Sequence, residues 1–296
     1  MRARYPDTEG YVEHGDGVRV FYEVYGDETE TVCFLPEWPI THSRTWKGQI
    51  PYLARHFRVI TIDPRGNGRS DRPRHAAAYS RAAHVADVLA VLDATGTDRT
   101  MMISLSPRAP LALALAVEHP DRVLAAAFIT PQLWNLNEFV ASFRAGDREH
   151  YDGYDKFNPR YWKQDYPGFV EWFAESVFFH PHSTRQIEDT IAYAFETDGE
   201  TLIAATVGFE MYERDEALTL AREVRCPVLV TQNGGAAFWP KECSGPLAEA
   251  TGGRLMVFDD LGPAVAGRWP VAMNLALREF FESVRSGAGA ETGAVA

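Results

Sequence analysis

Residues 58–71 read RVITIDPRGNGRSD, a run rich in β-branched residues that leads into a loop containing Gly66 and Gly68. β-Branched side chains favour strands, so residues 58–62 are predicted to form a buried strand. Glycines at such a boundary indicate a tight strand-to-helix loop. The loop lacks the third glycine and the spacing of a dinucleotide fingerprint, so we do not interpret it as a phosphate-binding loop.

Outward from this loop, strand-type and helical patterns alternate. Strands are expected at residues 31–35, 100–105, 123–129, 226–231 and 254–258, and helices at 42–56, 82–95, 107–118, 243–251 and 270–284. Alternation of this kind is typical of βαβ units. The predicted fold class is therefore α/β, with a mostly parallel, doubly wound sheet.

The alternation stops after Pro131, where a long helical stretch rich in aromatic residues begins and continues to about Arg222. We interpret this stretch as an inserted cap. The predicted organisation is a core made of residues 1–131 and 223–285, a helical cap at 132–222, and a disordered tail at 286–296, which is rich in glycine and alanine.

Composition excludes several classes of function. The formal net charge of −12 disfavours binding to nucleic acid or to an anionic membrane. No apolar run approaches the roughly 18 residues of a membrane helix, and the first residues lack a signal-peptide core, so we expect a cytoplasmic protein. The widely spaced Cys33, Cys226 and Cys243 predict reduced thiols, with no disulfide and no zinc site. We expect neither a metal nor another cofactor.

Three spaced motifs carry a family resemblance. They are Phe34-Leu-Pro-Glu-Trp38, His42-Ser-Arg-Thr-Trp46 and Asp63-Pro-Arg-Gly-Asn-Gly-Arg-Ser-Asp71. Together they resemble the α/β-hydrolase superfamily, in particular its capped esterase, epoxide-hydrolase and lyase-like branch, over about residues 10–281. The resemblance implies an α/β-hydrolase core with an inserted helical cap and a Ser-His-Asp catalytic triad.

The nucleophile turn of that superfamily, Gly-x-Ser-x-Gly, corresponds to Ser104-Leu-Ser106-Pro107-Arg108 in this chain. Ser106 occupies the nucleophile position, but both flanking glycines are replaced. In the superfamily the residue after the nucleophile donates its backbone N–H to the oxyanion, and Pro107 has no N–H to donate. The second expected donor lies after residue 35, where the amide of Trp38 is the candidate.

The resemblance also locates the other two triad positions. The acid is expected after the strand ending near residue 231, where Ala236 stands, and the base is expected where Gly262-Pro263 stands. We therefore predict a degenerate triad. Further histidines, His42, His84, His180 and His182, lie elsewhere, with surface or capping roles expected for them.

Two charged residues stand where the hydrolase pattern has glycine, and we predict both to be catalytic with Ser106. Arg108 could hold an enolate, phenolate or carboxylate, and Glu37 could act as a general base. The alternatives are that Arg108 and Glu37 pair with each other, or that one of them points to solvent.

The predicted substrate-binding residues are Trp38, Pro107, Trp134 and Trp239, and the predicted partner is a hydrophobic, aromatic small molecule. The preferred hypothesis is a cofactor-independent, non-hydrolytic catalyst of cyclisation, carbon–carbon bond formation or lyase chemistry on a polycyclic natural product such as an aromatic polyketide. A non-catalytic binding protein and an esterase that uses Ser106 with an unpredicted base are the alternatives. A homodimer is left open.

Overall fold

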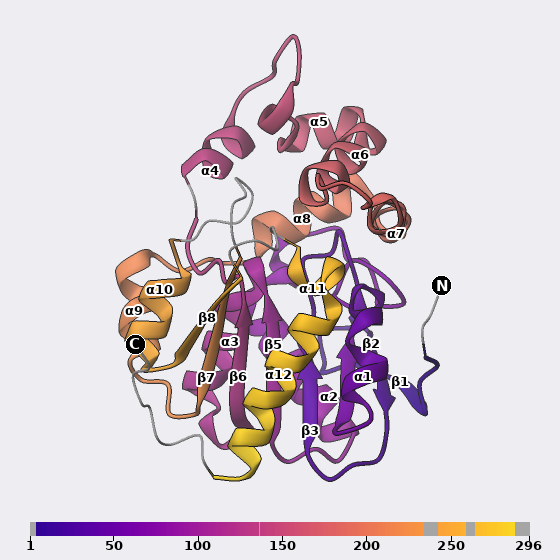
Figure 1. The fold of residues 1–296 in the computed structure, drawn as a ribbon. Helices are drawn as coiled ribbons and strands as arrows, with labels where there is room; N and C mark the ends of the chain where they lie inside the picture. The colour runs from indigo at the N-terminus through magenta and orange to yellow at the C-terminus, as the bar shows by residue number, and fades with distance from the viewer. Residues whose placement is uncertain (1–3, 136, 234–241, 259–263, 288–296) are drawn as a thin grey trace.

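The computed structural model describes residues 4–135, 137–233, 242–258 and 264–287. Within these residues one eight-stranded sheet has the order β1-β2-β4-β3-β5-β6-β7-β8 (Figure 1). The strands are β1 (Thr8–Val12), β2 (Val20–Tyr25), β3 (Thr31–Phe34), β4 (Arg58–Ile62), β5 (Thr100–Leu105), β6 (Val123–Ile129), β7 (Val228–Asn233) and β8 (Arg254–Phe258). The pairs from β4 to β8 are parallel. The predicted fold class is confirmed.

The strand predictions agree closely with the structure from residue 31 onward, with one shift. β7 begins at Val228 because Pro227, which lacks an N–H, precedes it. The antiparallel strands β1 and β2 were not predicted from the sequence. They pair with Val12 opposite Val20, and a turn containing Gly15 and Gly17 at positive φ joins them.

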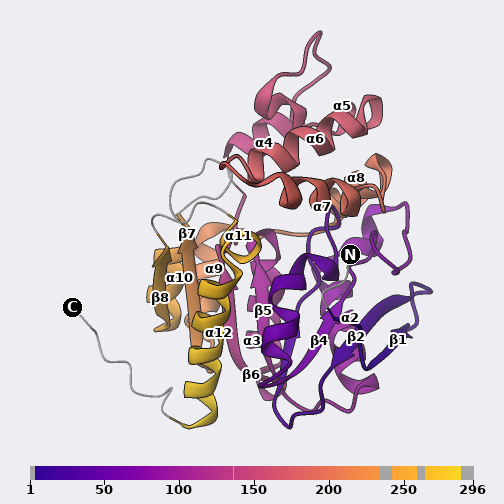
Figure 2. The same cartoon turned by 45° about the vertical axis from the view of Figure 1, so that its right-hand side comes forward.

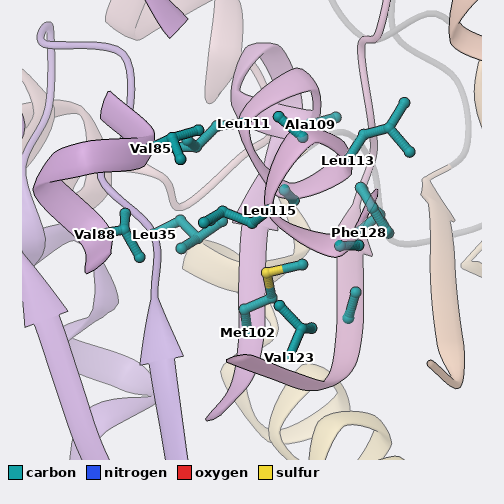
Figure 3. Packing of buried hydrophobic residues seen from close by; sticks show 14 of the residues in the cluster. Leu35, Val85, Val88, Met102, Ala109, Leu111, Leu113, Leu115, Val123 and Phe128 are labelled. Carbon is teal, nitrogen blue, oxygen red and sulfur yellow. The ribbon is translucent and has the colours of Figure 1, made fainter. Parts of the chain in front are cut away.

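Helices cover both faces of the sheet. One face carries α1 (Ile50–Leu53) and α12 (Pro270–Arg285), and the other carries α2 (Arg81–Ala94), α3 (Ala109–Glu118), α9 (Arg214–Ala221) and α10 (Ser244–Thr251). Figure 3 shows part of the second interface, where Val85 of α2 points toward Leu111 of α3, and Leu115 of α3 lies near Met102 of β5. Two buried hydrophobic clusters, one on each face, thus hold the sheet.

The single helix predicted at residues 42–56 is wrong. The structure has a 3-10 helix, η1 (Ser43–Gly48), followed by the short α1. Trp46 leaves the helical conformation at φ −83° and ψ 15°, and Pro51 in the first turn of α1 has no N–H to continue a helix from the preceding residues. The apolar residues therefore keep helical spacing although they lie in two separate short helices, η1 and α1.

Five helices gather beyond one end of the sheet (Figures 1 and 2). They are α4 (Asn137–Arg144), α5 (Pro159–Gln164), α6 (Tyr166–Val177), α7 (Thr184–Ala194) and α8 (Gly199–Gly208). Their aromatic side chains form a cluster that includes Trp162 and Phe169. α9 packs against α3 and α10. The boundaries predicted for the cap stay a prediction.

Short elements complete the described chain. They are η2 (Ala76–Tyr79), η3 (Ser106–Arg108), η4 (Pro120–Arg122), η5 (Gly153–Lys156) and α11 (Val265–Arg268). Among the helices of the described ranges, none combines the length and the apolarity needed to cross a membrane. The tail predicted to be disordered lies mostly outside the described residues.

Candidate active site

The site is organised around the sharp turn that follows β5. Ser106 adopts φ +46°, in the left-handed region, and Pro107 and Arg108 continue as η3 into α3. The backbone N–H of Gln132 donates to the Ser106 carbonyl oxygen at 3.0 Å and fixes the turn. A left-handed residue that is not glycine costs about 1–2 kcal/mol, and such strain concentrates at functional sites. The strained elbow is therefore present although both flanking glycines are replaced.

A pocket of about 620 Å³ opens above this elbow. Ser106, Pro107 and Arg108 line it from the core. Its other walls are largely aromatic or polar side chains from the segments over the sheet, and include Trp38, Gln132, Phe143, Phe157, Phe173, Thr206 and Phe209. The carboxyl end of β5 thus meets the aromatic helical segment at a partly open, mostly apolar space of the size that ligand sites have.

Arg108 is a buried cation that faces the pocket. Its side chain is 2% exposed, and its guanidinium carbon lies 4.0 Å from the centroid of the Phe209 ring. Nε and Nη2 are buried and donate to no acceptor among the residues that the structure describes. Burial lowers the pKa of Arg108 to about 9, and the nearby Glu37 partly opposes that shift, so the guanidinium is charged at neutral pH. Unpaired N–H donors on a desolvated cation provide a strong site for an anionic oxygen.

Glu37 is buried and is not among the described lining residues of the pocket. The Thr41 hydroxyl donates to Oε2 at 2.7 Å, and Oε1 has no hydrogen-bond partner. Burial raises the pKa of Glu37 to about 8, so the carboxyl is mostly protonated at neutral pH. Glu37 and Arg108 neither form an ion pair in the described structure nor point to solvent. The predicted role of Glu37 as a general base stays a prediction.

The three predicted tryptophans have different environments. Trp38 lines the pocket, donates from Nε1 to Thr206 Oγ1 at 3.0 Å, and contacts the rings of Phe157 and Phe173. Within the described residues its backbone N–H has no backbone acceptor. Trp134 packs in the core cluster below α9 and is not among the described pocket residues. Trp239 lies outside the described residues.

All nine histidines of the chain fall within the described ranges, and the pocket lining described here includes none of them. His84 comes near the site, because its ring packs against Phe209 with centroids 5.3 Å apart. Its Nδ1 bonds the Ser80 carbonyl at 3.0 Å, and burial together with Arg108 holds its pKa well below the ordinary value. His42 is buried between Asp63 and Glu196.

The positions predicted for the triad acid and base, Ala236 and Gly262-Pro263, lie outside the described residues. The described part of the chain contains no group of three or more His, Cys, Asp or Glu side chains arranged for a metal ion. Cys33, Cys226 and Cys243 are free thiols.

Comparison with known proteins identifies the family. Residues 31–198 match the sequence profile described as "alpha/beta hydrolase fold". The chain belongs to the α/β-hydrolase fold family. The match begins at β3 and ends just before α8, so it includes the elbow and most of the helices above the sheet in this α/β hydrolase.

Relatives of this α/β hydrolase include epoxide hydrolase B of Mycobacterium tuberculosis (strain ATCC 25618 / H37Rv), which is 42% identical over 79 residues. That match covers 26% of this chain and 22% of the relative, so the chain spans less than a quarter of that protein's length. RutD of Variovorax paradoxus (strain S110), provisionally named a carbamate hydrolase, is 30% identical over 241 residues, covering 77% of this chain and 82% of RutD.

A solved structure supports the fold of this α/β hydrolase. A thermophilic esterase from Thermogutta terrifontis superposes with a TM-score of 0.77 at 21% identity, covering 94% of this chain and 99% of the esterase. Identity at this level supports the shared fold alone.

Sequence reasoning missed several residues of the site. Phe209 follows α8 and stacks on Arg108, although a hundred residues separate the two. Phe143 and Arg144 of α4 also line the pocket. The density of aromatic residues after Pro131 pointed to an aromatic wall, but it could not select which rings face inward.

Proposed function

We propose that this member of the α/β-hydrolase fold family is a non-hydrolytic, cofactor-independent enzyme that binds a large aromatic substrate and stabilises negative charge developing on a substrate oxygen. The reaction class that fits is cyclisation, carbon–carbon bond formation or lyase chemistry on a polycyclic natural-product intermediate. The observation that carries the proposal is Arg108, a buried guanidinium with unpaired N–H groups in the pocket wall.

Arg108 would replace the oxyanion donor that the elbow lacks. Pro107 follows Ser106 and has no N–H. Arg108 is the next residue, and it lines the same pocket. Fixed donors in a water-poor site stabilise developing charge strongly, and loss of one such donor costs about 2.7–4 kcal/mol in hydrolases. The free amide of Trp38 and the Ser106 hydroxyl would complete the donor set.

Hydrolysis through Ser106 is disfavoured by the surroundings of this residue. A serine hydroxyl is a weak nucleophile unless a neighbouring base removes its proton. The described pocket residues include no histidine. His84 bonds a carbonyl and packs against Phe209, and His42 is held between carboxylates, so neither is arranged as the partner of Ser106.

Chemistry without a covalent nucleophile is compatible with this pocket. Holding a substrate in a reactive conformation supplies about 7–11 kcal/mol of a barrier in favourable cases. Rings such as Trp38, Phe157 and Phe173 present flat surfaces for this purpose. If Glu37 takes a proton as a general base, it must first lose its own, so this step would be faster above about pH 8.

Two other functions remain in competition. Epoxide hydrolase B and RutD are named as hydrolases, and this chain has the strained turn at Ser106, which favours an esterase with a different base. A binding protein without catalysis would also use the unpaired Arg108. It differs from the enzyme by showing altered affinity, but no turnover to lose, when Arg108 is replaced.

The test combines labelling, hydrolysis and binding. Folded wild-type protein and Ser106→Ala are treated with a fluorophosphonate, read by intact mass, and assayed with generic esters. We expect no Ser106-dependent labelling or hydrolysis, together with binding of polycyclic aromatic acids that Arg108→Gln weakens. Stoichiometric labelling with Ser106-dependent turnover would establish the esterase. Equal affinity of wild-type protein and Arg108→Gln for these acids would also overturn the proposal.

A further inference from the structure

We infer that the substrate of this pocket carries two acidic groups, one bound by Arg108 at the base and the other by Arg144 at the mouth. This inference rests on the proposed function, since it requires Arg108 to be an anion site. It adds a second binding residue and defines the substrate as an elongated aromatic diacid, with carboxylate or ionised phenol groups at both ends.

The pocket wall contains charged side chains, two of which could bind an acidic group. Among the described lining residues they are Arg108, Arg144 and Glu210. Glu210 is engaged elsewhere, because its Oε2 accepts the Arg81 backbone N–H at the start of α2 at 2.6 Å. Within the described residues Arg144 forms no ion pair. The described part of the pocket wall therefore presents two cations with no ion-pair partner, in a protein whose formal net charge is −12.

The two arginines differ in depth. Arg108 is 2% exposed and follows the elbow directly, whereas Arg144 is exposed and ends α4. A basic residue in the last turn of a helix interacts favourably with the helix dipole. That interaction accounts for an arginine at the end of α4, but it does not account for its place in the pocket wall.

The surface between the two cations is aromatic. Phe143 precedes Arg144 on α4, and its ring lies 5.9 Å from that of Phe157, which in turn lies 5.9 Å from Trp38. A ligand that reaches from Arg108 to Arg144 would lie against these rings. The body of the substrate is therefore expected to be flat and apolar, with its charges at the two ends.

Because Arg108 is buried and Arg144 is exposed, salt should affect ligand binding at the two arginines differently. Charges at the surface are screened by salt, whereas buried charges are screened much less. An exposed ion pair contributes about 0.2–1 kcal/mol, which limits the gain from Arg144 to about fivefold in affinity. Binding at Arg108 should resist salt, and the additional affinity from Arg144 should disappear in molar salt, where the Debye length is about 3 Å.

The experiment uses matched pairs of aromatic acids in titration calorimetry. The pairs are benzoate and terephthalate, 2-naphthoate and 2,6-naphthalenedicarboxylate, and 4-biphenylcarboxylate and 4,4′-biphenyldicarboxylate. The measured quantity is the affinity ratio of diacid to monoacid in wild-type protein, Arg108→Gln, Arg144→Gln and Arg222→Gln. Arg222 is exposed and is not among the pocket residues, so it controls for the loss of one surface charge.

At low salt, and for the pair of acids whose length fits the pocket, we expect the diacid-to-monoacid affinity ratio of wild-type protein to exceed that of Arg144→Gln about three- to fivefold. The ratio of Arg222→Gln should equal that of wild type. Monoacid binding should depend on Arg108 alone. If monoacids do not bind, or bind equally well in Arg108→Gln, the proposed function fails and this inference fails with it. If monoacids bind through Arg108 but the ratio is the same in Arg144→Gln at every length, only the second acidic group is refuted.

Discussion

Replacement of Arg108 by methionine should make the protein more stable while removing its affinity for anionic ligands. The guanidinium is buried, and its Nε and Nη2 donate to no acceptor. A buried donor without a partner costs about 1–3 kcal/mol, so the two together cost about 2–6 kcal/mol. Methionine has a similar length and can occupy the same space without any donor to satisfy.

Part of this gain is offset by contacts that methionine loses. The guanidinium stacks on Phe209 at 4.0 Å, and a desolvated cation–π contact contributes about 2 kcal/mol. The net expectation is a gain of about 2 kcal/mol, within the range seen when buried charges are replaced by apolar residues. An unfolding entropy of about 2.1 cal/mol/K per residue amounts to about 0.6 kcal/mol/K for 296 residues, so that change should raise the Tm by roughly 3 °C.

Arg65 provides the matched control because it is a second fully buried arginine with paired nitrogen atoms. Its guanidinium donates to both carboxylate oxygens of Asp87, at 2.5 and 2.7 Å, and to Asp16 and the Ala78 carbonyl. Arg65→Met leaves Asp87 buried without its partner, which should cost about 3–5 kcal/mol. The same chemical change thus has opposite expected signs at two buried sites.

Urea unfolding at pH 7, followed by far-UV circular dichroism, measures both variants against wild type. The comparison uses the midpoint, provided that the slope with denaturant is unchanged. A loss of more than about 1 kcal/mol in Arg108→Met would refute the reasoning, since it would show that this cation is satisfied in the folded protein and serves structure.

Further changes test other features of the site and fold. Burial raises the pKa of Glu37 from 4.5 in the unfolded chain to about 8, so ionisation of this carboxyl opposes folding. As the pH rises from 5 to 8, the free energy of unfolding of the wild type should therefore fall by about 2–4 kcal/mol relative to that of Glu37→Gln. Equal pH dependence in urea unfolding of both proteins would contradict this. Pro107→Ala restores the missing N–H yet should gain no esterase activity, because the described pocket lining contains no histidine that could take the Ser106 proton; Ser106-dependent turnover would contradict this. Gly208→Ala places a methyl group against a backbone carbonyl of η2 and should cost about 3 kcal/mol, whereas Gly245→Ala, which meets open space in α10, should be neutral or stabilising by up to about 1 kcal/mol. Thermal unfolding measures both, and equal Tm shifts would count against the close packing.

The fold was predictable because local patterns and tertiary structure agree over most of the core. The runs at residues 58–62, 123–129 and 254–258 coincide with β4, β6 and β8. β-Branched runs bounded by glycine and proline define such strands without long-range information. The prediction of a single helix at residues 42–56 was wrong because Pro51 interrupts the helical hydrogen bonding but leaves the spacing of the apolar residues unchanged.

The site was predictable only where its residues follow strands directly. Ser106, Pro107 and Arg108 line the pocket because the elbow follows β5 directly, whereas their predicted catalytic and binding roles stay predictions. Glu37 also follows a strand, but it is buried and is not among the described lining residues, and no local sequence pattern distinguishes it from Arg108 in this respect. The contact of Arg108 with Phe209 depends on the course of the chain between β6 and α9, and no local pattern contains that information.

Pro107 has a consequence for the history of such a site. The first turn of a helix needs no N–H donor from this position, so proline enters without disturbing the fold, and its rigid ring reduces the freedom of the unfolded chain by about 0.4–1 kcal/mol in favourable cases. Reversal to a residue with an N–H gives up that benefit and restores one backbone donor at the turn. Stability of the folded chain therefore favours proline at this position, whereas donation of a hydrogen bond to an oxyanion disfavours it.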